Sequence, residues 1–144
     1  MSADDDKKFL PKVTVPYSPT IFGVKMPLIQ VSFDGIPLPV ASLLDSGATN
    51  SMLHPRIASS VGLKIDYSKK YVGTGAGGSF DYVKSGPIKI QVLGQRYDIE
   101  FDIPLDENFA WPCILGHNSI FKFSKIVFKT YKQEFDIFFR NDIN

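Results

Sequence analysis

The stretch that most constrains this chain is a mostly apolar segment, Val40–Leu44, that runs directly into Asp45-Ser46-Gly47. Such a segment predicts a buried strand. A carboxylate at the end of a buried strand loses hydration free energy unless hydrogen-bond donors or a shared proton compensate, so Asp45 is a functional candidate. Because Asp, Ser and Gly are also common turn residues, a plain strand followed by a turn is the alternative.

Length and composition indicate one folded domain. A chain of 144 residues is long enough for a single hydrophobic core and short for two. The apolar fraction of 44%, with twelve phenylalanines, is that of a globular protein. We therefore expect a flexible tail at residues 1–12, one domain at residues 13–140 that begins with a proline-rich arm, and a C-terminal tail at residues 141–144.

Charge and cysteine content exclude several classes of partner. A net charge of +1, without a basic stripe, gives no electrostatic reason for nucleic-acid binding. No apolar run has the length of a membrane span, and the polar start lacks the hydrophobic segment of a secretory signal. Cys113 is the only cysteine, so no internal disulfide can form, and we expect this residue in the core. The expectation is a cytoplasmic protein without membrane contact.

The patterns of glycine, proline and alternating residues predict an all-β domain with one or two short helices. Four prolines between Phe9 and Pro27 favour an extended arm, packed on its own domain or crossing to a partner. A helix is expected within Met52–Leu63, and a helical turn at residues 118–121. Strands are expected at Leu28–Phe33 and Ile36–Leu44, joined by a two-residue turn at Asp34-Gly35, and at Ile65–Val72, Lys84–Leu93, Gln95–Ile103, Cys113–Gly116, Lys125–Thr130 and Glu134–Phe139.

Two further motifs follow Asp45 along the chain. Gly73–Gly78 contains four glycines, but no helix signal and no Gly-Lys-Ser/Thr ending follow, so a phosphate-binding loop is not supported. We expect this segment to be the mobile tip of a hairpin. The second motif is Ile114-Leu115-Gly116, an apolar strand that ends on glycine as the Asp45 strand does.

These three features, in this order and at this spacing, resemble the retropepsin-like, single-domain aspartic proteases. The resemblance covers roughly Leu28 to Phe139. It implies a closed, mostly β acid-protease barrel in which Ile114-Leu115-Gly116 passes through the loop formed around the Asp motif. Such threading would bury Leu115 and hold the Asp45 loop rigidly.

The chemistry of peptide hydrolysis by an activated water needs two facing carboxylates, one ionised and one protonated. The first accepts a proton from water and the second donates one to the carbonyl oxygen. This chain has a single copy of the motif, so the second carboxylate must come from another copy of the chain. We therefore expect a homodimer with Asp45 of each subunit at the two-fold axis, and an inactive monomer.

The resemblance also implies roles for the neighbouring residues. Ser46 would hydrogen-bond across the axis, Gly47 would leave room for the substrate backbone, and Ala48 would line the cleft. The glycine-rich tip would be a flap that closes over an extended peptide and excludes water. Its substrate-binding residues would be Gly75, Ala76, Gly77 and Gly78. An ordinary flexible hairpin without ligand contact is the alternative for this segment.

Two positions depart from the viral members of the family. There the motif commonly continues with an Asp two residues after the glycine, paired to an Arg that follows the glycine of the second motif. Here these positions are Thr49 and His117. A contact between hydroxyl and imidazole is the expected replacement, so the strength of the dimer is in question. The chain is thus more similar to cellular and bacterial members.

Other conspicuous residues carry no separate chemistry. His54 and His117 lie far apart in the sequence without a cluster of Cys or carboxylates at ligand spacing, so no metal site and no cofactor are expected. Trp111-Pro112 is expected to pack in the core or on the dimer surface rather than to bind substrate.

The sequence therefore favours an aspartic endopeptidase that cleaves extended polypeptides, with apolar residues around the cut, at mildly acidic pH. One alternative is a non-catalytic dimeric peptide-binding module of the same fold. A domain processed from a larger precursor is another, although nothing in Met1–Lys12 marks a junction.

Overall fold

The computed structural model describes residues 8–75 and 77–142. Its strands are β1 (Val13–Pro16), β2 (Ser18–Pro19), β3 (Lys25–Met26), β4 (Leu28–Phe33), β5 (Val40–Leu44), β6 (Ser51–Leu53), β7 (Tyr71–Gly75), β8 (Gly78–Val92), β9 (Gln95–Pro104), β10 (Cys113–Leu115), β11 (Ser124–Lys129) and β12 (Glu134–Phe139). Two short α-helices, α2 (Pro55–Val61) and α3 (Ile120–Phe123), and a 3-10 turn, η1 (Thr130–Lys132), complete the described elements. The mostly β fold class is as expected.

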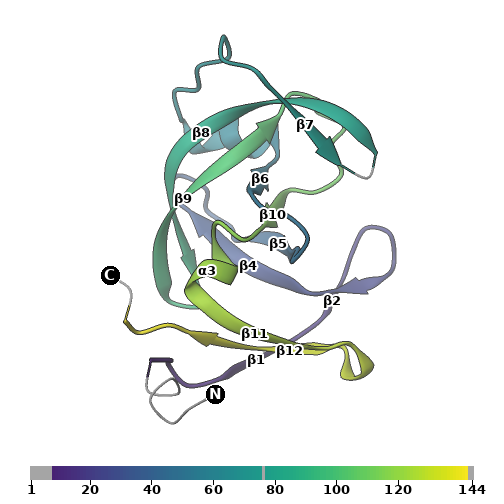
Figure 1. The fold of residues 1–144 in the computed structure, drawn as a ribbon, viewed down its shortest axis with the longest axis vertical. Coiled ribbons are helices and arrows are strands. Elements are labelled where there is room, and N and C mark those ends of the chain that lie inside the picture. The colour runs from purple at the N-terminus through teal and green to yellow at the C-terminus, as the bar shows by residue number, and fades with distance from the viewer. Residues whose placement is uncertain (1–7, 76, 143–144) are drawn as a thin grey trace.

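The main sheet closes on itself. Its strand order is β4-β5-β10-β6-β9-β8-β7, and an additional pairing of β4 with β8 joins the two sides (Figure 1). β8 can serve both β7 and β4 because an irregularity between Lys84 and Pro87 bends it. At this bulge the Ser85 hydroxyl accepts a hydrogen bond from the Phe101 N–H at 3.0 Å, so the displaced backbone donor stays satisfied.

Strand β10 is threaded between β5 and β6. It pairs in parallel with β5, Ile114 opposite Leu43, and antiparallel with β6, Ile114 opposite Met52. Because β5 and β6 are consecutive in the chain, the loop that joins them, residues 45–50, must pass around the end of β10. Leu115 is fully buried there. The threading implied by the resemblance is therefore present.

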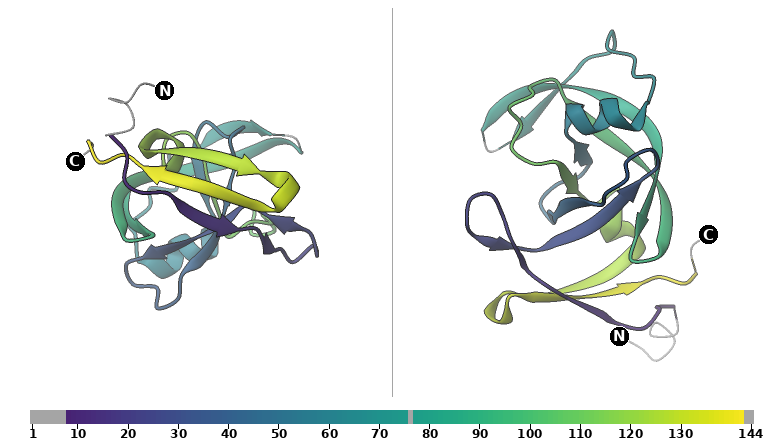
Figure 2. Two further views of the ribbon diagram at one scale, coloured as in Figure 1. Left: turned by 90° about the horizontal axis from the view of Figure 1, so that it is seen from below. Right: turned by 180° about the vertical axis from the view of Figure 1, so that it is seen from behind.

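A second, three-stranded sheet, β1-β12-β11, lies along one end of the closed sheet (Figure 2). β12 alternates between two environments: Phe135, Ile137 and Phe139 are buried in the main core with residues of β4, β8 and β9. On its other face Asp136 is bound by the Lys129 ammonium at 2.7 Å and the Thr14 hydroxyl at 2.7 Å. The proline-rich arm thus packs on its own domain as an edge strand.

The hairpin between β4 and β5 differs from the expected two-residue turn. A tight turn does form at Asp34-Gly35, since the Ile36 N–H donates to the Phe33 carbonyl at 3.3 Å and Gly35 has φ +85°. Pairing resumes only at Val40, opposite Val31. The intervening Pro37 and Pro39 have no N–H to donate to a ladder, so β5 starts later than predicted.

Other hairpins follow the sequence pattern more closely. β8 and β9 meet at Leu93-Gly94, where both residues have positive φ, as a two-residue hairpin turn requires. β11 and β12 pair around η1 as expected. The expected strand Ile65–Val72 is wrong in its first part: the Asp66 carboxylate accepts from the Ser68 N–H at 3.0 Å, and this turn delays the strand until Tyr71.

The two helices lie close to the segments in which they were predicted. α2 begins at Pro55 and ends before Gly62, within the predicted segment, and α3 begins slightly later than the helical turn expected at residues 118–121. Near the termini, Phe9 bridges Arg140, and the Leu10 N–H donates to the Phe139 carbonyl at 2.7 Å. None of the helices in the described ranges is long and apolar enough to cross a membrane.

Gly116→Ala tests the threading. A Cβ at this position would lie 2.6 Å from the Ala48 carbonyl oxygen and 2.7 Å from that of Asn50, both backbone atoms of the encircling loop. We expect the substitution to lower the free energy of unfolding by about 3 kcal/mol, or the melting temperature by roughly 10 °C. Gly77→Ala, where a Cβ meets nothing within 4 Å, is the control for thermal denaturation. Equal melting temperatures for the two variants would contradict the threading.

Candidate active site

Asp45 lies directly after β5 at the start of the loop around β10. Its N–H donates to the Leu115 carbonyl at 3.0 Å, so the pairing with β10 continues through this residue. One carboxylate oxygen, Oδ1, accepts from the Gly47 N–H at 2.9 Å, and the Asp45 carbonyl accepts from the Ala48 N–H at 3.1 Å. The side chain is half-buried. The loop therefore wraps around its own carboxylate and engages it through Oδ1.

A buried polar network holds this loop from beneath. The Ser51 hydroxyl accepts from the Gly116 N–H at 3.0 Å and lies 2.7 Å from Asn118 Oδ1. Asn118 Oδ1 also accepts from the Ser51 N–H at 2.8 Å, while its amide nitrogen donates to the Glu100 carbonyl at 2.9 Å. These bonds join both sides of the threaded crossing. Such a fully bonded network favours a single geometry for the loop that carries Asp45.

His117 forms hydrogen bonds to the backbone of the same loop. Its backbone N–H donates to the Ala48 carbonyl at 2.9 Å. Its imidazole Nε2 lies 2.5 Å from the Ser46 carbonyl oxygen, and because a carbonyl only accepts, Nε2–H is the donor. The ring stacks on Phe121 at 5.3 Å. The imidazole thus binds the backbone of the Asp45 loop, whereas a contact with the Thr49 hydroxyl was expected.

Asp102 is a supporting residue that no sequence motif marks. It lies in β9 beside the loop, 8% exposed, and its Oδ2 accepts from the Asn50 amide at 3.2 Å. Burial raises the pKa of this carboxyl, while the bond from Asn50 partly offsets the rise. The outward position in an alternating strand predicts an exposed side chain, but the loop covers it.

The glycine-rich hairpin is formed by β7 and β8. Gly75 pairs with Gly78, and Gly75, Gly77 and Gly78 are exposed, whereas Ala76 lies outside the described residues. The ring of Phe80 lies over Gly73, where a Cβ would come within 2.6 Å of it. In Figure 1 the end of β7 and the loop between β2 and β3 lie on the same side of the molecule, with β10 and the loop after β5 between them.

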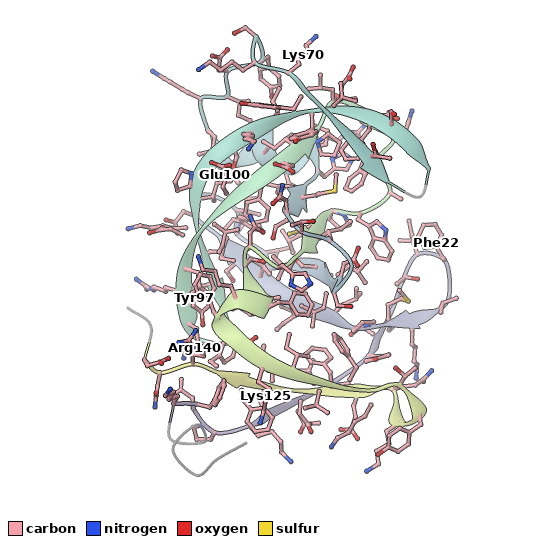
Figure 3. The ribbon with its side chains drawn as sticks, in the orientation of Figure 1. Phe22, Lys70, Tyr97, Glu100, Lys125 and Arg140 are labelled. Carbon is pink, nitrogen blue, oxygen red and sulfur yellow. The ribbon has the colours of Figure 1, made fainter. Side chains whose placement is uncertain are left out.

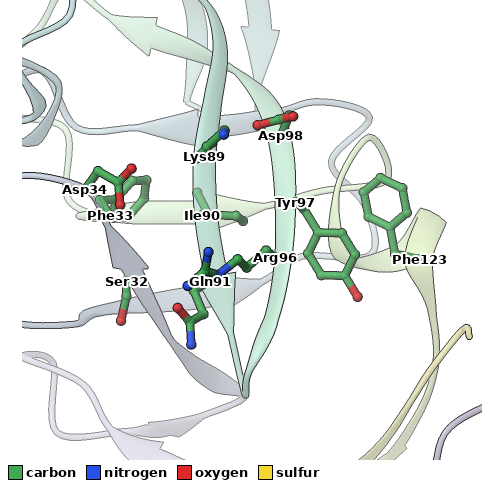
Figure 4. Close-up of a pocket in the computed structure, with 10 residues that line it drawn as sticks. All are labelled: Ser32, Phe33, Asp34, Lys89, Ile90, Gln91, Arg96, Tyr97, Asp98 and Phe123. Atoms are coloured by element: carbon green, nitrogen blue, oxygen red, sulfur yellow. The ribbon is translucent and has the colours of Figure 1, made fainter. Parts of the chain in front are cut away.

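The structure thus brings some predicted site residues together and places others apart. Asp45, Ser46, Gly47, Leu115 and Gly116 meet at the crossing. Ala48 packs with a small apolar cluster around Leu28, Leu43 and Ile114. In the described part of the chain, no hydrogen bond joins the glycines of the hairpin tip to the loop, and a pocket of about 480 Å³ formed by β4, β8, β9 and Phe123 contains none of the predicted residues (Figure 4).

The remaining reactive side chains have structural roles. His54 accepts from the Arg56 N–H at 3.1 Å through Nδ1, which caps α2, and its Nε2 lies 3.0 Å from the Glu107 carbonyl. Cys113 is fully buried, and burial raises the pKa of its thiol to about 12, which disfavours a thiolate nucleophile. Among the described residues, no group of three or more His, Cys, Asp or Glu is arranged to bind a metal.

Asp102→Asn tests the cost of burying that carboxylate. Because the pKa of Asp102 is raised in the folded state, the ionised form destabilises the fold, and this loss develops as the pH rises through the folded pKa. Asn keeps an oxygen that can accept from Asn50 but carries no charge. We therefore expect a melting temperature a few degrees above wild type at pH 7, and no difference once the pH falls below about 3.5. Asp98→Asn, an exposed carboxylate on the same strand, is the control. A gain that is the same at both pH values would contradict this account.

Comparison with known proteins places this geometry in a known fold. A family model described as aspartyl protease matches residues 29–104. The retroviral protease-like domain of Ddi1 from Leishmania major is 20% identical, with a TM-score of 0.60 over 84% of this chain and 92% of that chain. A retropepsin-like aspartic protease from Rickettsia conorii is 13% identical, with a TM-score of 0.62 over 92% of this chain and 96% of that chain. No curated protein matches the chain.

At these identities the two structures show a shared fold, and they confirm the retropepsin-like architecture and the likeness to cellular and bacterial members. The family model covers more than half of the 144 residues, from the second residue of β4 to the end of β9. With a matching family model and a matching fold, this chain belongs to the aspartyl protease family.

Proposed function

We propose that this chain is an aspartic endopeptidase that hydrolyses peptide bonds in extended polypeptides as a homodimer, with Asp45 of each subunit at the two-fold axis. The observation that carries the proposal is the Asp45 loop itself. The loop holds one carboxylate in a hydrogen-bonded turn at the place where β10 passes through it. The chain that carries this loop belongs to the aspartyl protease family.

The surroundings of Asp45 support a second subunit as the source of the other carboxylate. In the described part of the chain, the other carboxylate bonded to this loop is Asp102, which is buried and engaged by Asn50. It is therefore poorly placed to share a proton with Asp45. Ser46, Gly47, Thr49 and Asn50 are exposed, so the outer surface of the loop is available to a second copy.

The two carboxylates would divide the chemistry between them. The ionised Asp45 removes a proton from a water whose oxygen attacks the peptide carbonyl carbon, while the protonated Asp45 of the other subunit donates its proton to the carbonyl oxygen. Collapse of the tetrahedral intermediate breaks the C–N bond: the amine leaves with the proton that the pair holds, and one hydroxyl of the intermediate returns a proton to the pair as the new carboxyl group forms. The Gly47 N–H bond to Oδ1 holds each carboxylate in place during these transfers.

The substrate-binding roles rest on position and chemistry. A Cβ at position 47 would lie 3.3 Å from Asp45 Oδ1. Glycine therefore leaves the space beside the carboxylate open. Ala48 extends the apolar surface next to the loop. We propose that Gly75, Ala76, Gly77 and Gly78 form the flap, which would pair with the backbone of an extended peptide and exclude water.

Asp45→Asn tests the proposal directly. An amide can neither accept the proton of water nor supply one, so cleavage of an unfolded protein such as casein should fall on the order of 10³-fold or more. The measurement combines cleavage rates from about pH 3 to pH 8, where we expect a bell-shaped profile, with sedimentation of both proteins. Asp98→Asn, an exposed carboxylate of β9, is the matched control.

The outcomes separate the candidate functions. A dimer that loses cleavage in Asp45→Asn and keeps it in Asp98→Asn supports the protease. Cleavage by Asp45→Asn at the wild-type rate would refute it. Dimerisation and peptide binding without cleavage by the wild type would support the non-catalytic peptide-binding module instead.

A further inference from the structure

His54 contacts two points of the segment that joins β9 to β10. Its backbone N–H donates to the Pro112 carbonyl at 3.0 Å, and its imidazole Nε2 lies 3.0 Å from the Glu107 carbonyl oxygen. The other ring nitrogen, Nδ1, accepts from the Arg56 N–H at 3.1 Å at the start of α2. One residue thus joins both ends of residues 107–112, the wall segment, to the helix.

The wall segment forms part of the apolar surface beside the proposed catalytic loop. Phe109 and Trp111 pack against the same buried cluster that Ala48 of the Asp45 loop joins. The Trp111 ring also meets the ring of Phe22 edge to face at 6.0 Å, and Figure 3 shows Phe22 at the edge of the molecule. A displacement of the wall segment would therefore change the apolar surface next to the loop and the surroundings of the indole.

The two side-chain bonds of His54 require one protonation state. A backbone N–H only donates and a backbone carbonyl only accepts, so Nδ1 carries no proton and Nε2 carries one. A proton added to Nδ1 would face the Arg56 N–H, donor against donor. Because the ring is rigid, a rotation that separates these two groups also moves Nε2 away from the Glu107 carbonyl. Protonation therefore acts on both bonds together.

The charged groups around the imidazole do not replace these bonds. α2 and residues 105–112 carry three charged side chains, Arg56, Asp106 and Glu107, and β6 and β10 carry none. The Arg56 guanidinium and the Glu107 carboxylate lie 3.9 Å apart with side chains 76% and 67% exposed, so this ion pair holds the segment only weakly. The Asp106 carboxylate accepts from the Asn108 N–H at 2.9 Å. The hydrogen bonds of the imidazole are therefore the stronger tie between α2 and Glu107.

We propose that His54 is a positioning residue: its neutral imidazole holds the wall segment against α2, and its protonation releases the segment and weakens peptide binding. Histidine side chains change charge between about pH 5 and pH 8, so the held segment belongs to the upper end of this range and is lost as the pH falls through it. The backbone bond from His54 to Pro112 does not depend on the ring, so the release leaves β10 threaded. The effect on peptide binding rests on the proposed function, whereas the release itself does not.

Trp111 is the only tryptophan of the chain and reports on the wall segment. Emission spectra of the intact protein are recorded from about pH 5 to pH 8. We expect the emission of the wild type to shift to longer wavelength as the pH falls, because release exposes the half-buried indole. His54→Gln keeps a side-chain N–H that can donate to the Glu107 carbonyl and does not titrate. Its emission should stay at the position of the neutral wild type throughout.

Two further variants separate the bonds and the histidines. His54→Asn keeps an oxygen that can cap α2 but is too short to hold Glu107, so at neutral pH its emission should match that of the acidic wild type. His117→Gln removes the other histidine and should leave the wild-type shift in place. A wild type without a shift, a shift that persists in both His54 variants, or one that His117→Gln abolishes would overturn the inference and leave the proposed protease standing.

Peptide affinity tests the consequence for binding. Asp45→Asn is used because it removes the catalytic carboxylate and its titration. We expect a casein-derived peptide to bind roughly fivefold more weakly at about pH 5 than at about pH 8, the effect of one lost hydrogen bond. Adding His54→Gln to Asp45→Asn should abolish this difference. Equal affinities at both pH values, or a difference that the double variant keeps, would overturn the role in binding. If the wild type cleaves no peptide, the proposed function fails, and the Trp111 emission still decides whether His54 holds the wall segment.

Discussion

The crossing of β10 through the loop between β5 and β6 is the constraint on which the site depends. Gly116 passes so close to the carbonyl oxygens of Ala48 and Asn50 that no side chain fits there. Ser51 bonds to the Gly116 N–H, and Asp45 bonds through its N–H to Leu115. The candidate catalytic carboxylate is thus carried by a loop whose path is set by buried packing. A loop held in this way loses little conformational entropy when substrate binds.

Strand β5 connects the core to the carboxylate. One of its faces packs Val40 and Leu44 into the core shared by both sheets, and the other carries Ala41 and Leu43 toward the loop that begins with Asp45. His117 joins the same loop to the C-terminal part of the chain, since its ring stacks on Phe121 and Phe121 contacts Phe128 of β11.

The sequence predicted the parts of the fold that depend on local chemistry. Leu93-Gly94 and Pro55 occupy the turn and helix start that their backbone preferences favour, and the apolar run before Asp45 is a buried strand. The turn predicted at Asp34-Gly35 is present. The late start of β5 was not predicted, because Pro37 and Pro39 after this turn have no N–H with which to pair in the sheet.

The missed features of the site depend on contacts between distant segments. Asp102 is buried because the loop at Asn50 covers it, and His117 binds a backbone carbonyl that no pattern of side chains reveals. Trp111 packs against the apolar cluster of Leu28, Leu43 and Ile114, as expected of a core residue, but its contact with the ring of Phe22, which is distant in the sequence, was not predicted. Which residues meet across the fold is set by the threaded topology, and local periodicity carries no information about it.

The central claim is that two chains each supply one Asp45, and subunit mixing tests it most directly. Wild type and Asp45→Asn are unfolded and refolded together at a constant total concentration, with the wild-type fraction varied, and cleavage of one peptide is measured. If only dimers with two aspartates are active, activity follows the square of the wild-type fraction, so an equal mixture retains about one quarter of the activity. Activity proportional to the wild-type fraction, with about one half retained in the equal mixture, would show that a single Asp45 suffices and would contradict the account.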